Sequence, residues 1–318
     1  MAANRSRTRW LPRTLLVLAL GLALGLALGS PARAGGIYPN GSSDFMGGVL
    51  PPPGVYWLNY LAYIGKDKLL DDKGDEIGDF KADVFVEVPR FIYMSPHKVF
   101  GATWGVQVFF PLYKADAKLE IAGPGTIFDD DSKGLGDIIF SPCVLAWHLS
   151  PNLHMGAALD IWAPTGNYDK KNPASQILSQ NSWNFEAVYA VSYWVPGGLD
   201  VSGKFMYDIS TTNSDSDPAG SDLKSGQEFH VDYGVSYALG KEDFRLGASG
   251  YYFQQVTDDE LDGSKVDDSK ARVMSIGPTF KWWPGMGKFS LTAKYLKEFG
   301  GENIAQGQSA WINTTFVF

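Results

Sequence analysis

The feature that most constrains this chain is the regular alternation of long and short connections between segments with a period of two. Twelve segments alternate apolar residues with polar or small ones, so each would have one apolar face as a strand. These predicted strands are 55–64, 79–94, 99–114, 135–149, 153–163, 182–195, 199–210, 227–239, 244–257, 271–283, 288–297 and 309–318. Short connections (95–98, 150–152, 196–198, 240–243, 284–287) alternate with long ones (65–78, 115–134, 164–181, 211–226, 258–270, 298–308). Short turns on one side and long loops on the other are typical of transmembrane β-barrels.

The strand lengths also indicate a membrane-spanning sheet. A tilted strand needs about 9–11 residues to cross a bilayer, and most of the predicted strands reach that length. An unpaired sheet edge is costly in hydrocarbon, so the first and last strands should pair. The sequence therefore predicts an all-β fold, a closed transmembrane antiparallel β-barrel of about twelve strands over residues 55–318. Pro89, Pro142 and Pro278 lie within predicted strands, where proline removes a ladder donor, so we expect either bulges there or strands that end earlier than drawn.

The first 34 residues read as a cleaved secretory signal peptide. Four arginines precede an apolar run at 15–29, and a small-residue cleavage site follows at 32–34. The run is shorter than the roughly 20 residues of a spanning helix, which disfavours a membrane anchor. Removing residues 1–34 removes five arginines and no acidic residue, so the net charge changes from −8 to −13. This acidic balance argues against a nucleic-acid partner.

Residues 35–54, between the signal and the first strand, are proline-rich and apolar. This stretch either enters the barrel as a plug or hangs in the periplasm, and its apolar side chains favour burial in the lumen. The candidate plug residues are Phe45, Met46, Leu50, Pro51 and Pro52. Deleting residues 38–52 should then raise the conductance of the pore.

With the apolar faces toward lipid, the opposite faces supply the lumen-lining candidates. These are Asp83, Glu87, Gln107, His154, Asp160, Glu186, Lys204, His230, Asp232, Arg245, Tyr251 and Phe253. Both charge signs occur, which suits a polar, narrow lumen. Each polar residue taken singly also fits a structural hydrogen-bond network. The aromatic members, together with Phe85 and Phe109 of the same parity, would line a solute path by stacking or fill space around the plug.

Catalytic, cofactor and metal motifs are not predicted. His230 and Asp232 share a strand face and could form an acid–base pair, but the chain has no His-x-Ser-Asn-Gly segment of the kind found in barrel phospholipases. Residues 258–263 open like a calcium loop, yet the twelfth position is Ser269 rather than Glu. A solvated acidic loop is therefore preferred to a calcium site, with cation bridges to anionic lipid headgroups left open.

Several stretches of the mature chain resemble one known family. They are 45–54 (FMGGVLPPPG) with the following 55–60, then 134–137 (GLGD), 160–169 (DIWAPTGNYD), 226–233 (GQEFHVDY) and 251–259 (YYFQQVTDD). They are similar to the phenol meta-pathway degradation proteins, a family of outer-membrane transporters of Gram-negative bacteria. The resemblance implies passive uptake of hydrophobic or aromatic small molecules across the outer membrane. It supplies no catalytic or binding residues to carry over.

The expected partners follow from this interpretation. They are outer-membrane lipid, lipopolysaccharide, a hydrophobic solute and the barrel-assembly machinery, since the chain ends on an alternating strand with Phe318, as outer-membrane barrels do. Two other functions remain open. One is a structural or surface-interaction barrel without transport, and the other is a barrel hydrolase that uses His230.

Overall fold

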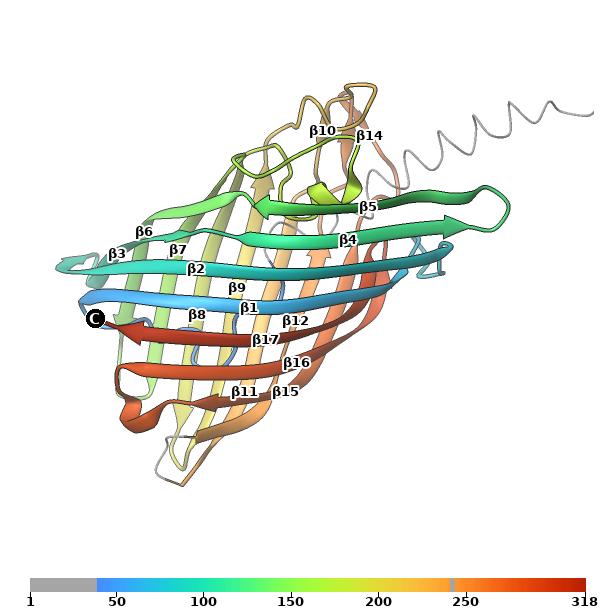
Figure 1. The fold of residues 1–318 in the computed structure, drawn as a ribbon. Helices are drawn as coiled ribbons and strands as arrows, with labels where there is room; N and C mark the ends of the chain where they lie inside the picture. Colours follow the sequence, from blue (N-terminus) through green and yellow to red (C-terminus); the bar gives the residue numbers. More distant parts are fainter. Residues whose placement is uncertain (1–38, 241–243) are drawn as a thin grey trace, which may run out of the picture.

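The fold is a closed antiparallel barrel of twelve strands (Figure 1). The computed structural model describes residues 39–240 and 244–318, so the predicted signal peptide and the first four residues of the predicted plug lie outside the described part. No helix in the described ranges is long and apolar enough to span a membrane. Closure comes from β1 (Gly54–Leu69), which pairs with both β2 (Asp79–Val99) and β17 (Ala305–Val317). The predicted fold class is therefore confirmed.

The other strands follow in chain order. The barrel continues through β3 (Ala102–Phe109), β6 (Ile138–His148), β7 (Leu153–Ala163), β8 (Asn184–Val195), β9 (Leu199–Ser210), β11 (Glu228–Leu239), β12 (Phe244–Gln255), β15 (Arg272–Trp282) and β16 (Phe289–Glu302). A hairpin, β4 (Leu112–Ile121) and β5 (Gly125–Leu135), continues the lines of β3 and β6. The connections contain β10 (Leu223–Lys224), β13 (Glu260–Leu261), β14 (Ser264–Lys265) and the 3-10 turns η1 (Pro173–Ile177) and η2 (Pro284–Met286).

The outer surface carries the apolar side chains expected of a wall in contact with lipid. Exposed large hydrophobic residues occur on strands all around the barrel. Near the short-turn end, aromatic rings of neighbouring strands stack on one another. The ring centroids of Trp57 and Phe316 are 5.1 Å apart, and those of Phe316 and Phe289 are 5.2 Å apart. Such a girdle is typical of the membrane–water interface in transmembrane barrels.

Two predicted long loops are hairpins instead. Residues 115–134 form most of β4 and β5, and their turn projects past the end of β2 (Figure 1). The loop predicted at 298–308 shrinks to residues 303–304 between β16 and β17. Along β4, charged residues alternate with Ala115, Ala117 and Leu119, which are buried. An alternating strand whose outer face meets water reads as a loop when only its charge content is considered.

The three prolines within strands behave differently. Pro142 lies in a bulge, since the register between β6 and β7 shifts between Phe140 and Cys143. Pro89 lies where β2 changes partner from β3 to β4, and its carbonyl accepts a hydrogen bond from the Phe110 N–H at 3.0 Å. Pro278 lies inside β15 and pairs in register with Ala248 of β12, so neither the bulge nor the earlier strand end is found there.

The inward prediction for Asp83 and Glu87 is also wrong. Alternate residues of β2, including Val84 and Val86, are buried in the main apolar cluster of the barrel interior. Asp83 and Glu87 lie on the opposite, outer face, where Glu87 accepts a 2.9 Å hydrogen bond from the Asn59 side chain. Phe85 is on that face too and is 59% exposed. This half of β2 pairs with the projecting β4, and its pattern is that of a sheet with water outside and an apolar core inside.

Candidate functional site

The lumen is occupied by the chain's own N-terminal segment, defined here as residues 39–53. The carboxylate of Asp232 on β11 accepts hydrogen bonds from the Gly41 and Ser43 N–H groups, both at 2.8 Å. On the other side, the Lys294 ammonium of β16 donates to the carbonyl oxygens of Ser42 and Ser43 at 2.9 and 2.8 Å. Barrel side chains thus replace the secondary-structure partners that this irregular backbone lacks.

Further along, the segment is fixed by hydroxyl groups of β8 and β9. The Met46 N–H donates to Ser202 Oγ at 2.9 Å, and the Gly48 N–H donates to Ser192 Oγ at 2.8 Å. Gly48 lies so close to β8 that a Cβ atom would be 2.6 Å from the Ser192 nitrogen. The sequence therefore needs glycine at this point of contact.

The segment also brings one acidic side chain into the lumen. Asp44 lies 3.5 Å from the Lys281 ammonium and 3.6 Å from that of Lys294. These ion pairs are almost fully buried, so each charge depends on the other for compensation.

The predicted plug residues occupy different parts of this arrangement. Phe45 and Met46 are buried at 2% and 6% exposure. Leu50 and Pro51 are half-buried, while Pro52 is exposed. All five contribute to one lumen cavity.

That cavity, of about 550 Å³, runs between the N-terminal segment and the barrel wall. Its wall is largely apolar and includes Leu58, Ile92, Val144, Ala158 and Val188. A smaller cavity of about 40 Å³ lies beyond it. Residues that line both cavities mark the neck between them: Ser42, Ser43, Tyr60, Arg90, Phe109, Asp160 and Lys204.

The neck has a cation beside an aromatic ring. The Arg90 guanidinium carbon lies 4.8 Å from the ring centroid of Phe109, and Arg90 Nη1 donates to the Tyr60 hydroxyl at 2.7 Å. Of the two roles left open for Tyr251 and Phe253, the packing agrees with space filling, because both lie in the main apolar cluster.

The structure turns ten of the twelve predicted lumen residues inward: Gln107, His154, Asp160, Glu186, Lys204, His230, Asp232, Arg245, Tyr251 and Phe253. Several form small networks. The Gln107 amide donates to Asp160 Oδ1 at 3.0 Å, His154 contacts His148 at 2.8 Å between the two Nδ1 atoms, and Arg245 donates to Ser236 Oγ at 3.2 Å. Tyr251 hydrogen-bonds to Glu298.

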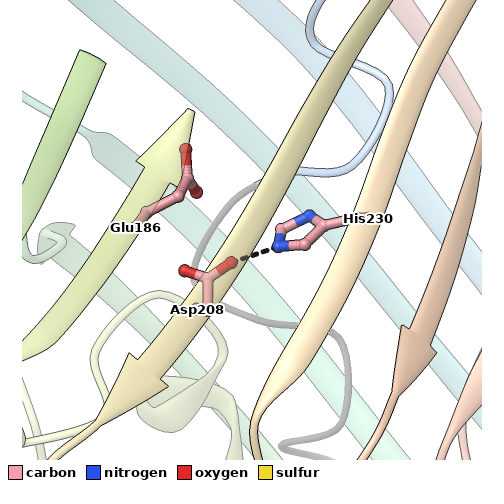
Figure 2. Close-up of side chains that lie close together, drawn as sticks. All are labelled: Glu186, Asp208 and His230. Carbon is pink, nitrogen blue, oxygen red and sulfur yellow. Dashed lines mark hydrogen bonds and ion pairs between the residues drawn. The ribbon is translucent and has the colours of Figure 1, made fainter. Parts of the chain in front are cut away.

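A buried charged cluster lies on β8, β9 and β11, near the end of the barrel that carries the long loops (Figure 2). Its members are Glu186, Asp208 and His230, each at most 3% exposed. The His230 imidazole pairs through Nε2 with Asp208 of the neighbouring strand, and not with Asp232, which shares its strand face. Asp232 instead holds the N-terminal segment.

Sequence reasoning missed two of these functional residues. Asp208 has the same strand parity as Lys204, which was predicted to face the lumen, so parity alone would have found it. Asp44 precedes the strands, in a segment without periodicity, and only the fold shows that it reaches two lysines.

The calcium-like loop contains an ion pair of its own. The Lys265 ammonium lies 2.8 Å from Asp258 Oδ2, and this hydrogen bond lowers the pKa of Asp258. The first acidic position of that loop is therefore already neutralised by a lysine.

A closed antiparallel barrel with an apolar outer belt, an aromatic girdle and a charged, occupied lumen defines a transmembrane β-barrel of the outer-membrane type. The chain belongs to the family described as "Putative MetA-pathway of phenol degradation", whose model matches residues 66–314. The resemblance noted from the sequence motifs is thus confirmed.

Two solved structures are similar to this chain to different degrees. The COG4313 outer membrane channel from Pseudomonas putida F1 is 18% identical with a TM-score of 0.73, covering 85% of this chain and 97% of that one. A TodX monoaromatic hydrocarbon channel mutant is 10% identical with a TM-score of 0.47, covering 91% and 98%. At 18% identity the likeness to the COG4313 channel shows the fold alone. No curated protein sequence gave a match.

Proposed function

We propose that the protein is an outer-membrane channel for the passive uptake of hydrophobic or aromatic small molecules, with the N-terminal segment as a plug that narrows the path. The observation that carries this proposal is the cavity of about 550 Å³ between the segment and an apolar stretch of the barrel wall. Small-molecule sites commonly have about 300–1,000 Å³, so the cavity can hold a molecule with a single aromatic ring.

The chemistry of the neck suits the same class of solute. The Phe109 ring offers a face for stacking, and Arg90 and Lys204 place two cations beside the path. Aromatic acids would find both a ring partner and a favourable charge there. Membership of a family described by phenol degradation agrees with this solute class, and the fold shared with an outer membrane channel agrees with a transport role.

The remaining partners are proposed with the channel. The outward apolar belt would contact lipid, and the charged outer face of the β4–β5 hairpin would contact lipopolysaccharide or water. Phe318, 72% exposed at the end of β17, would present the assembly signal to the barrel-assembly machinery.

Single-channel recording tests the proposal. With the mature protein in a planar bilayer, benzoate should cause concentration-dependent blockades of the current, and acetate at the same concentration should not. Replacing Phe109 by Ala should shorten the blockades by roughly three- to tenfold, as expected from loss of one stacking contact. The matched control is Phe85→Ala, because Phe85 is on the outer face.

Two results would overturn the proposal. A barrel without measurable current would favour a structural or surface-interaction role, and equal blockades by acetate and benzoate would remove the aromatic selectivity.

A further inference from the structure

We propose that Glu186, Asp208 and His230 form a binding site for one divalent transition-metal ion of the Zn²⁺ class, inside the barrel. The three side chains come from the adjacent strands β8, β9 and β11, and each offers a ligand atom within 4.8 Å of the other two. Figure 2 shows the side chains side by side in the interior.

Glu186 is the observation that distinguishes this cluster from an ordinary ion pair. Its side chain is fully buried, and neither carboxylate oxygen has a hydrogen-bond partner. A buried carboxylate without partners is costly, and native structures rarely leave one without a function. Here an oxygen of that unpartnered carboxylate lies within 4.8 Å of the ligand atoms of Asp208 and His230. A bound cation at this point would satisfy it.

The other two ligands are held in place by amide side chains. Asn40 Oδ1 lies 2.9 Å from His230 Nδ1, which leaves Nε2 directed at the cluster. The Asn184 amide donates to Asp208 Oδ1 at 2.5 Å, which leaves Oδ2 on the cluster side. Partners of this kind fix the orientation of metal ligands in established sites.

Charge and ligand type define the class of ion. Two carboxylates and a neutral imidazole carry a charge of −2, which a divalent cation cancels. One nitrogen and two carboxylate oxygens suit Zn²⁺, Fe²⁺ or Mn²⁺, whereas Ca²⁺ and Mg²⁺ prefer oxygen alone. Tetrahedral Zn²⁺ with bonds near 2.0–2.1 Å places its ligand atoms roughly 3.3 Å apart, so small side-chain rotations would close the site.

Metal binding would also act on the N-terminal segment. His230 links the cluster to that segment through Asn40. An ion on Nε2 holds the ring in the tautomer whose Nδ1–H donates to the Asn40 oxygen, so a bound ion would strengthen docking at this point.

Metal content and spectroscopy test the proposal without any transport assay. The mature protein, purified in detergent without a histidine tag, is stripped with EDTA, incubated with Zn²⁺ and passed through metal-free buffer. We expect one Zn²⁺ per chain by mass spectrometry, and visible absorption bands of a histidine-containing site when Co²⁺ replaces Zn²⁺. The variants Glu186→Gln and His230→Gln should lower the affinity by roughly tenfold or more.

Glu298→Gln is the matched control. Glu298 is another buried carboxylate of the lumen, bonded to Tyr251 and Lys66 and outside the cluster. Each variant is first checked for folding by its heat-dependent mobility on gels. Where one cluster variant fails to fold, the other still decides.

The proposal is overturned if the wild-type protein retains no metal, or if Glu186→Gln and Glu298→Gln bind it equally. In the first case the cluster is held by a proton shared between Glu186 and the His230–Asp208 pair.

Discussion

Two walls of the same barrel solve the problem of a buried interior in opposite ways. The apolar wall, formed by β2 and β4, packs side chains such as Val84, Val86 and Leu119 into the main apolar cluster. The polar wall, formed by β8, β9 and β11, buries Glu186, Asp208 and Asp232 instead. The apolar wall is complete through packing alone. The polar wall needs partners, and the N-terminal segment supplies backbone N–H groups to it. The polar wall therefore binds the N–H groups of the segment, while Lys281 of β15 and Lys294 of β16 hold it from the other side.

The largest effect is expected at Asp232, where the polar wall binds the segment. Asp232→Leu removes the acceptor of two N–H groups and should weaken docking by about 3–5 kcal/mol, the usual cost of breaking a buried charge interaction. Maleimide labelling of Ser43→Cys, in a Cys143→Ser background, should become faster. Unchanged labelling would mean that the polar wall does not hold the segment.

A substitution in the apolar wall should change stability but not docking. Leu119→Ala leaves a cavity at a fully buried position and should lower the free energy of unfolding by about 2–5 kcal/mol, measured by urea titration in lipid vesicles. The control Leu119→Met keeps the volume and should cost less than about 1.5 kcal/mol. If labelling at Ser43→Cys also changed, the two walls would not be independent.

The close approach at Gly48 gives a smaller and more local effect. In Gly48→Ala the new methyl group meets the Ser192 backbone and should weaken docking by about 1–3 kcal/mol, seen as a moderate rise in labelling. Gly47→Ala is the control, because its Cβ would have only an ordinary contact at 3.6 Å. Equal behaviour of the two variants would contradict the observed path of the segment.

Removing the loop ion pair between Asp258 and Lys265 should have the smallest effect on stability, because the Lys265 side chain is exposed and the pair belongs to neither wall. The lowered pKa of Asp258 means that the pair stabilises the loop at neutral pH and loses this contribution as the pH falls below about 4. Lys265→Met should weaken the loop slightly at pH 7, because exposed ion pairs contribute little, and this is measured as faster proteolysis at residues 258–270. A cost that did not shrink as the pH fell below about 4 would exclude the ion pair as the cause.

Periodicity and loop lengths predicted the barrel because the pleat and the bilayer act on every strand in the same way. Parity failed on β2, where Val84 is turned inward and Asp83 outward. In this half of β2 the polar residues face outward, as in a sheet exposed to water. A single sequence does not show which part of a strand lies outside the hydrocarbon core of the membrane. For the same reason, the sequence pattern predicts a loop where the structure has the β4–β5 hairpin.

The site was less predictable than the fold. The inward set included Glu186 and His230, but their partner Asp208 is set by the register between three strands separated along the chain by long loops. The contacts of Asp44 depend on the path of an irregular segment, which has neither the strand period of two residues nor the helix period of about 3.6 residues. Both the register between strands and the path of an irregular segment depend on contacts between residues far apart in the chain. Local residue patterns do not predict such contacts.

Single-channel conductance of the mature chain, compared with a variant that lacks residues 39–52, tests most directly whether the N-terminal segment fills the lumen of a closed barrel. We predict a larger conductance for the deletion variant, with folding unchanged by gel mobility. Identical conductance of the two folded proteins would contradict a segment that occupies the path.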